Sequence, residues 1–279
     1  MESLDRTFFD LANLFNRNQI LSFIKTTNYE KWNSLVYTLE LKRNLKKNLT
    51  YSEVFDSLYN VLKNNYKCEY IYLNEIFLQE LLKEHEINPT IITEFNVNSS
   101  KADLVIVNGT TTVYEIKTEL DTLNRLEKQL LDYIKVFERV YIITYEKNVD
   151  EIKKFLKIKF SLKKVGIKIL KNNGDLETIK KSGSFIKDFD KEFIFKCLIK
   201  KERDFFDKDY YIAKEKFLKK SKIYIHEYFK KCLLERKKDI DFIETLPKSL
   251  KMIGHKLQNT LNKSQKEAFY IKLTKKINF

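Results

Sequence analysis

Two carboxylates and one amine lie close together in the middle of this 279-residue chain. Asp103 begins a run of apolar and β-branched residues, and Glu115 and Lys117 lie at the end of the next such run. The dipeptide Asn108–Gly109 between the two runs is a strong signal for a β-hairpin. With a three-residue loop, Asp103 is expected directly across from Glu115, with Cβ atoms about 4.5–5.5 Å apart. Glu115 and Lys117 are two positions apart on one strand, so their side chains share a face.

Like charges that face each other destabilise a hairpin, so this cluster is expected to require a counter-charge. Mg²⁺, for which Mn²⁺ can substitute, binds carboxylate oxygens and keeps several of its waters. A metal-bound water is a nucleophile at neutral pH, and Lys117 would orient it or stabilise the developing negative charge. The residues therefore predict a metal-dependent nuclease that hydrolyses phosphodiester bonds. The alternative is an ordinary exposed hairpin face on which Asp103 forms an ion pair with Lys117.

The period of the apolar residues predicts the elements that position this cluster. Helical spacing covers residues 1–64 and a helix at about 69–84. Short runs rich in β-branched and aromatic residues predict strands at 91–97, 103–107, 112–117, 139–145 and 166–170. Helices are expected between these strands, at about 123–137 and 149–156, and only helices after residue 183. The expected fold is α/β with a mixed sheet, divided into an N-terminal helical segment (1–65), a core (66–172) and a basic C-terminal helical region (173–279).

At these residues the sequence resembles the PD-(D/E)XK nuclease superfamily, which has the restriction-endonuclease-like fold, over about residues 66–172. The family pattern is an Asp at the start of one core strand and (Asp/Glu)-x-Lys in the next, within an α-β-β-β-α-β core. Ala102 stands where the family name has Pro. The resemblance implies a Mg²⁺-dependent nuclease acting on DNA, in defence against foreign DNA or in DNA repair. It assigns Asp103 and Glu115 to the metal and to catalysis, and Lys117 to catalysis.

Four further residues complete the candidate site. The resemblance implies that Glu75, on the first core helix, joins the metal site. Similarity to the RecB-like branch implies that Gln129 and Tyr133 contact a phosphate or the catalytic lysine, and their i, i+4 spacing places them on one helical face. Lys101, two residues before Asp103, is a candidate phosphate contact. Plainer alternatives are a solvent-facing Glu75, a solvated Lys101 and a Tyr133 that only fills the core.

The charge is distributed unevenly along the chain, whose formal net charge is +14. Residues 1–150 hold 18 Lys/Arg and 22 Asp/Glu, whereas residues 151–279 hold 35 and 17. A net charge of −4 is thus followed by one of +18, which predicts nucleic acid as a partner of the second half. Lysines alternate there with aromatic residues that could stack on bases, at Lys214, Lys216, Phe217, Lys219, Lys220, Lys222, Tyr224, Tyr228, Phe229, Lys230 and Lys231. The alternatives are amphipathic helices with the aromatic rings in the core, and compositional drift in an AT-rich genome.

Several classes of protein are disfavoured. No apolar run reaches the ~18 residues of a spanning helix, and the N-terminus lacks a signal-peptide pattern, so a cytoplasmic protein without membrane contact is expected. Three scattered cysteines form no disulfide or metal framework, and no Gly-rich phosphate loop is present. Two hypotheses compete with the nuclease. One is a catalytically silent protein of the same fold that binds nucleic acid or regulates a partner, and the other is a partner-dependent subunit whose N-terminal helices dock another protein. The helical regions are also candidates for contact with a protein partner or for a homodimer.

Overall fold

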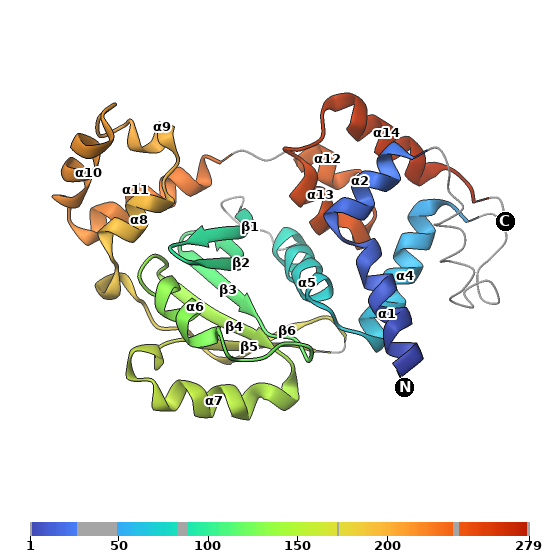
Figure 1. The fold of residues 1–279 in the computed structure, drawn as a ribbon, viewed down its shortest axis with the longest axis horizontal. Helices are drawn as coiled ribbons and strands as arrows, with labels where there is room; N and C mark the ends of the chain where they lie inside the picture. Colours follow the sequence, from blue (N-terminus) through green and yellow to red (C-terminus); the bar gives the residue numbers. More distant parts are fainter. Residues whose placement is uncertain (1, 27–48, 83–88, 172, 237–239, 278–279) are drawn as a thin grey trace. The chain divides into compact units, whose positions relative to one another are not determined.

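The structure is a computed structural model that describes residues 2–26, 49–82, 89–171, 173–236 and 240–277. The chain forms two compact units (Figure 1). Unit 1 comprises Met1–Leu78 together with Lys238–Phe279, and unit 2 comprises Gln79–Lys237. These units do not coincide with the predicted three-part division, because both ends of the chain belong to unit 1. Part of the predicted N-terminal helical segment, residues 27–48, lies outside the described residues.

Unit 1 is helical, and its core joins the two ends of the chain. Thr50 and Glu53 form a capping box that begins helix α4. The Phe23 ring lies 5.5 Å from that of Phe55 and 6.3 Å from that of Phe269, on three different helices. The helices are α1 (Glu2–Leu14), α2 (Arg17–Lys25), α4 (Tyr51–Asn65), the first part of α5 (Glu69–Leu82), α12 (Ile240–Glu244), α13 (Lys251–Leu257) and α14 (Lys263–Thr274).

Unit 2 contains a six-stranded mixed sheet with strand order β1-β2-β3-β4-β5-β6. The strands are β1 (Thr90–Val97), β2 (Ser100–Val107), β3 (Thr111–Ile116), β4 (Arg139–Thr144), β5 (Gly166–Leu170) and β6 (Leu176–Lys180). Strands β3, β4 and β5 are parallel, and the other neighbours are antiparallel. The α/β class with a mixed sheet is confirmed, whereas the finer assignment to a restriction-endonuclease-like core is not. Strand β6 is absent from the sequence prediction.

Turn residues fix the register of the first three strands. Asn98 has a φ of 52° in the tight turn between β1 and β2. Gly109 has a φ of 93° in the next turn, a conformation that glycine adopts without steric cost. Leu104 then pairs with Tyr114, which is the register that the Asn–Gly loop predicts. Continuing this ladder by one residue reaches Asp103 and Glu115.

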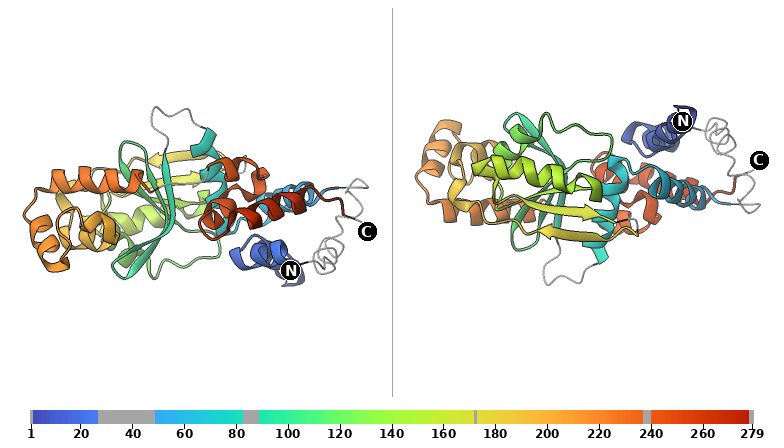
Figure 2. Two further views of the ribbon diagram at one scale, coloured as in Figure 1. Left: turned by 90° about the horizontal axis from the view of Figure 1, so that it is seen from above. Right: turned by 90° about the horizontal axis from the view of Figure 1, so that it is seen from below.

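Helices connect the parallel strands and extend the core beyond the sheet. Helix α6 (Leu126–Tyr133) joins β3 to β4, and α7 (Val149–Ile158) joins β4 to β5. Residues 191–236, here called the helical group, follow the sheet and are seen beside it in both views of Figure 2. The group contains α8 (Lys191–Cys197), α9 (Lys200–Arg203), α10 (Tyr210–Leu218) and α11 (Lys222–Leu234). One hydrophobic cluster runs from the sheet through α6 and α7 into α8, α10 and α11.

Within the described ranges, no helix is both long enough and apolar enough to cross a membrane.

Candidate functional site

The candidate site lies at the carboxyl end of β3, beside the parallel strand β4. The Lys117 N–H donates to the Ile143 carbonyl at 2.8 Å, and the Thr144 hydroxyl donates to the Lys117 carbonyl at 2.8 Å. Both contacts continue the pairing of β3 with β4 past the last residue of the strand. In α/β sheets, the carboxyl ends of parallel strands are the usual place for functional side chains. The backbone that carries Glu115 and Lys117 is therefore held firmly.

Glu115 is the centre of a buried polar network. Only 1% of its surface is exposed. Lys117 Nζ donates to Glu115 Oε1 at 2.7 Å and to Gln129 Oε1 at 3.2 Å. The Tyr133 hydroxyl lies 2.8 Å from Glu115 Oε2 and 3.0 Å from the Lys101 carbonyl. Four of the predicted site residues thus meet here. Gln129 and Tyr133 lie on one face of α6, as their i, i+4 spacing predicts.

Burial and charge act in opposite directions on the pKa of Glu115. Removal from water raises the pKa, while the Lys117 ammonium and the hydrogen bonds from Lys117 and Tyr133 oppose the increase. Burial also raises the pKa of Tyr133, and the neighbouring carboxylates of Glu115 and Asp103 raise it further. Tyr133 is fully buried in the core while its hydroxyl contacts the network. It therefore fills the core, as one of the two alternatives states, while its hydroxyl contacts Glu115 and the Lys101 carbonyl rather than the Lys117 side chain. The predicted phosphate contact stays a prediction.

Asp103 uses its carboxylate to hold the backbone of the neighbouring strand. Its Oδ2 accepts the Ile116 N–H at 2.7 Å. A charged acceptor on a backbone donor makes a strong hydrogen bond. Each carboxylate therefore has donors of its own, and the expected like-charge conflict that called for a metal is resolved by protein groups. The alternative of an ordinary exposed hairpin face is also wrong, because Lys117 is buried and pairs with the buried Glu115.

Asp132, which the sequence analysis missed, docks α6 onto the β1–β2 turn. Its carboxylate accepts hydrogen bonds from the Asn98 amide at 3.1 Å and the Ser100 hydroxyl at 2.7 Å. Asp132 is next to Tyr133 in sequence, so adjacent residues of α6 contact the turn and the Glu115 network. The helical spacing of the apolar residues gave no signal for this, because the partners of Asp132 are neutral side chains 34 and 32 positions earlier in the chain.

The remaining predicted residues are placed differently. Lys101 Nζ lies 3.4 Å from Glu94 Oε2 on the exposed surface, and its role as a phosphate contact stays a prediction. Glu75 belongs to unit 1, where it accepts a hydrogen bond from Tyr59 at 2.8 Å and pairs with Lys63 at 3.1 Å. Both partners of the Glu75 carboxylate lie on helix α4, whereas Glu75 itself lies on α5.

The donor set does not fit the expected metal. Both Glu115 oxygens face donors, and one Asp103 oxygen accepts a backbone N–H. In the part of the chain that the structure describes, no group of three or more His, Cys, Asp or Glu side chains could hold a metal ion. The Mg²⁺ or Mn²⁺ site therefore stays a prediction that this geometry does not support.

His226 is a second buried titratable group that the sequence analysis did not single out. It lies on α11 with Nε2 3.4 Å from the Thr111 hydroxyl and 3.5 Å from Glu138 Oε2, and Nδ1 3.6 Å from Glu227 Oε1. Burial lowers the pKa of His226, and the charges of Glu138 and Glu227 oppose that effect. The imidazole joins the helical group to the start of β3.

We expect the lowered pKa of His226 to make the protein less stable in mild acid. Below the ordinary His pKa of about 6.5, the unfolded chain binds this proton more readily than the folded chain. The free energy of unfolding should therefore fall as the pH decreases from 6.5 towards the lower pKa of the folded state. Urea unfolding of the wild type and of His226→Gln at several pH values checks this, and the variant should lose less stability. Equal losses in both proteins would exclude His226 as the cause.

Comparison with known proteins assigns the chain to a family. The family model for bacteriophage P4 protein cII matches residues 62–266. The chain belongs to this family. A curated relative, Protein cII of Enterobacteria phage P4, is 35% identical over 94 residues. That match covers 28% of this chain and 36%, about a third, of the relative's own length. No solved structure matches the chain.

Membership of the cII family overturns the nuclease prediction. The match covers most of the chain and is to the phage cII family, whereas the resemblance to the PD-(D/E)XK superfamily rested on a few residues. The predictions of a Mg²⁺-dependent nuclease, of a hydrolase and of roles in DNA defence or repair are therefore wrong. The physical reason is the low specificity of Glu-x-Lys in a chain with 33% charged residues. Here that spacing forms a buried ion pair.

Proposed function

We propose that this member of the cII family is a phage regulatory protein that acts by binding nucleic acid through its helical group. Membership of a phage family and the strongly basic second half of the chain support this function. The helical group contains 14 Lys/Arg and 8 Asp/Glu, a net charge of +6. An excess of cations on one part of a protein attracts the phosphate backbone whatever the sequence of the bases.

The observation that carries the proposal is a set of exposed lysines without counter-charges. Lys200, Lys201 and Lys208 are exposed and form no ion pair with any described residue. Other lysines of the group are engaged: Lys219 pairs with Glu215, and Lys222 donates to the Lys187 carbonyl. Because Lys200, Lys201 and Lys208 have no ion-pair partner among the described residues, their charges are the most available to phosphates. The predicted protein partner or homodimer stays a prediction.

The salt dependence of binding tests the proposal. Replacing Lys200, Lys201 and Lys208 with Gln should reduce the slope of log affinity against log salt by up to about two for single strands or three for duplexes. Fluorescence anisotropy with labelled oligonucleotides at increasing salt concentrations measures this slope.

A matched control removes the same charge elsewhere on unit 2. Lys153, Lys154 and Lys157 are exposed on α7, and replacing them with Gln should leave the slope unchanged. An equal decrease for both triple variants would show that no particular surface is used. Absence of binding by the wild type at every salt concentration would refute the proposed function itself.

A further inference from the structure

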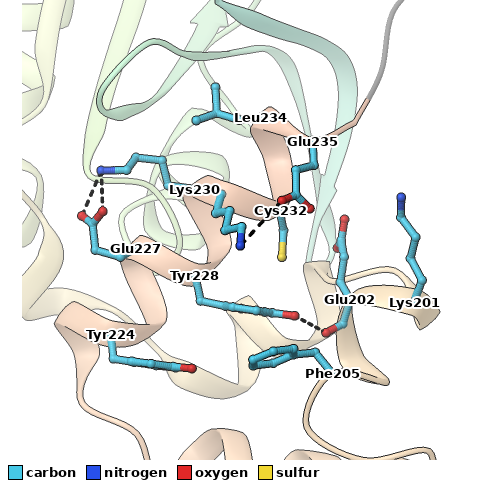
Figure 3. A pocket seen from close by; sticks show the side chains of 11 residues that line it. Lys201, Glu202, Phe205, Tyr224, Glu227, Tyr228, Lys230, Cys232, Leu234 and Glu235 are labelled. Atoms are coloured by element: carbon cyan, nitrogen blue, oxygen red, sulfur yellow. Dashed lines mark hydrogen bonds and ion pairs between the residues drawn. The ribbon is translucent and has the colours of Figure 1, made fainter. Parts of the chain in front are cut away.

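A pocket of about 630 Å³ lies beside the exposed face of α11. Tyr224, Tyr228 and Lys230 line it from α11, and Lys201 and Phe205 line it from α9 and the segment that follows (Figure 3). All of its lining residues belong to unit 2. The pocket is separate from the Glu115 network, and the proposed function uses only one of its lysines.

Three aromatic rings dominate this pocket. The rings of Tyr224 and Tyr228, one helical turn apart, are parallel within 1° with centroids 6.5 Å apart, and both are seen edge-on in Figure 3. The Phe205 ring lies 5.1 Å from that of Tyr228 at an angle of 28°. Tyr228 is anchored because its hydroxyl donates to the Glu202 carbonyl. The three rings, here called the ring cluster, are therefore arranged around a central tyrosine that is anchored before any ligand binds.

The ring cluster exposes large apolar surface. Phe205 is 66% exposed and Tyr224 is 41% exposed. By contrast, Phe217 on α10 and Phe229 on α11 are fully buried, as the amphipathic-helix alternative predicted for them. Adjoining exposed rings on a charged surface are typical of a binding site. Aromatic faces suit planar ligands, and preformed ones lose little conformational entropy on binding.

The charges around the ring cluster favour an anionic ligand. Each of the three carboxylates that line the pocket already has a cation: Glu202 has Arg236 at 2.9 Å, Glu227 has Lys230 at 2.7 Å and Glu235 has Lys231 at 3.8 Å. Lys201 has no such partner among the described residues. Lys220 Nζ lies 5.3 Å from the centre of the Tyr224 ring. Two ammonium groups that form no ion pair with any described residue thus accompany the rings, while the acidic groups are neutralised.

We propose that the ring cluster binds unpaired nucleobases, which makes single-stranded nucleic acid the ligand class; this rests on the proposed function. Bases in a duplex are stacked on both faces, whereas unpaired bases can stack on aromatic side chains. Phosphates of the same strand would meet Lys201 and Lys220. Rings and lysines on one surface are the combination that single-strand binding uses.

Alanine variants of the two exposed rings test this inference. Tyr224→Ala and Phe205→Ala should each weaken binding of a single-stranded oligonucleotide about fivefold to a hundredfold, the range for loss of one stacked base. Binding of an abasic strand and of a duplex should not change, because neither offers an unpaired base. Tyr224→Phe keeps the ring and should bind like the wild type. Anisotropy titrations measure all of these affinities, and unchanged thermal melting shows that the variants are folded.

Tyr211 supplies the matched control. It is a tyrosine of the same helical group, 79% exposed on α10 and outside the pocket, so Tyr211→Ala should not change the affinity. If the wild type binds duplexes at least as tightly as single strands, and Tyr224→Ala alters neither, the inference is wrong while the proposed function stands. If the wild type binds no nucleic acid at all, the proposed function is wrong as well.

Discussion

Replacing Lys117 with Met is expected to lower the free energy of unfolding by about 3–5 kcal/mol, because it leaves the buried Glu115 carboxylate without its cation. Met is similar in length to the lysine stem, so the change removes charge and hydrogen bonds but little volume. Urea unfolding followed by circular dichroism measures the loss. Lys157→Met, on the exposed surface of α7, is the matched control and should change stability by less than about 0.5 kcal/mol.

The pH dependence of the Lys117→Met variant supplies an independent check. Burial already raises the pKa of Glu115, and loss of Lys117 removes the main opposing influence. A carboxyl group whose folded pKa exceeds its unfolded pKa contributes stability at low pH, which is lost as the pH rises through the folded value. The deficit relative to the wild type should therefore be smaller at mildly acidic pH than above neutrality. A deficit that did not vary with pH would point to lost packing rather than to an unpaired charge.

Removing both charges should cost less than removing one. In Glu115→Gln combined with Lys117→Met, no unpaired charge is buried, and Gln still offers an oxygen to the Tyr133 hydroxyl. The double variant should therefore recover part of the stability lost by Lys117→Met alone. Additive losses would show that the two side chains do not interact energetically, in spite of their 2.7 Å contact.

Local sequence signals predict the geometry of the candidate site well. The Asn–Gly loop predicts the β2–β3 register, and the i, i+4 spacing predicts that Gln129 and Tyr133 share one face of α6. On that face the structure places Gln129 against Lys117 and Tyr133 against Glu115. Both signals depend on short stretches of backbone, whose conformation is set by neighbouring residues. The role of Asp103 could not be obtained in this way, because its partner is a backbone N–H that has no signature in residue type.

Long-range packing and function could not be predicted from the same signals. Helix α2 and helix α14 share a core in unit 1, although Phe23 and Phe269 lie at opposite ends of the chain. Strand β6 is polar and partly exposed, so pairing with β5 rather than side-chain burial defines it. The Glu-x-Lys motif at Glu115 and Lys117 is only three residues long, whereas the cII family model matches residues 62–266. The family is therefore assigned from the long match and not from the chemistry that the short motif suggests.

The second large effect is expected for Phe229→Ala, which should lower the free energy of unfolding by about 3–5 kcal/mol. Phe229 is fully buried on α11, with its ring 6.3 Å from that of Phe137 and 6.4 Å from that of Phe95. It therefore packs the helix that carries part of the ring cluster against the sheet and the segment after α6. Because one hydrophobic cluster includes all three residues, the loss should shift the unfolding of unit 2 as a whole. Urea unfolding measures the shift.

Tyr224→Ala is the matched comparison, because it removes an aromatic ring from the same helix at an exposed position. We expect it to change stability by less than about 1 kcal/mol. The two variants are therefore distinguishable. Phe229→Ala should lower stability and weaken the binding of every ligand alike, whereas Tyr224→Ala should weaken only the binding of single strands. If Tyr224→Ala were as destabilising as Phe229→Ala, the Tyr224 ring would be part of the core and could not serve as a base-stacking surface. The alternation of lysines and aromatic rings in this segment therefore has two physical origins, which stability and binding measurements separate.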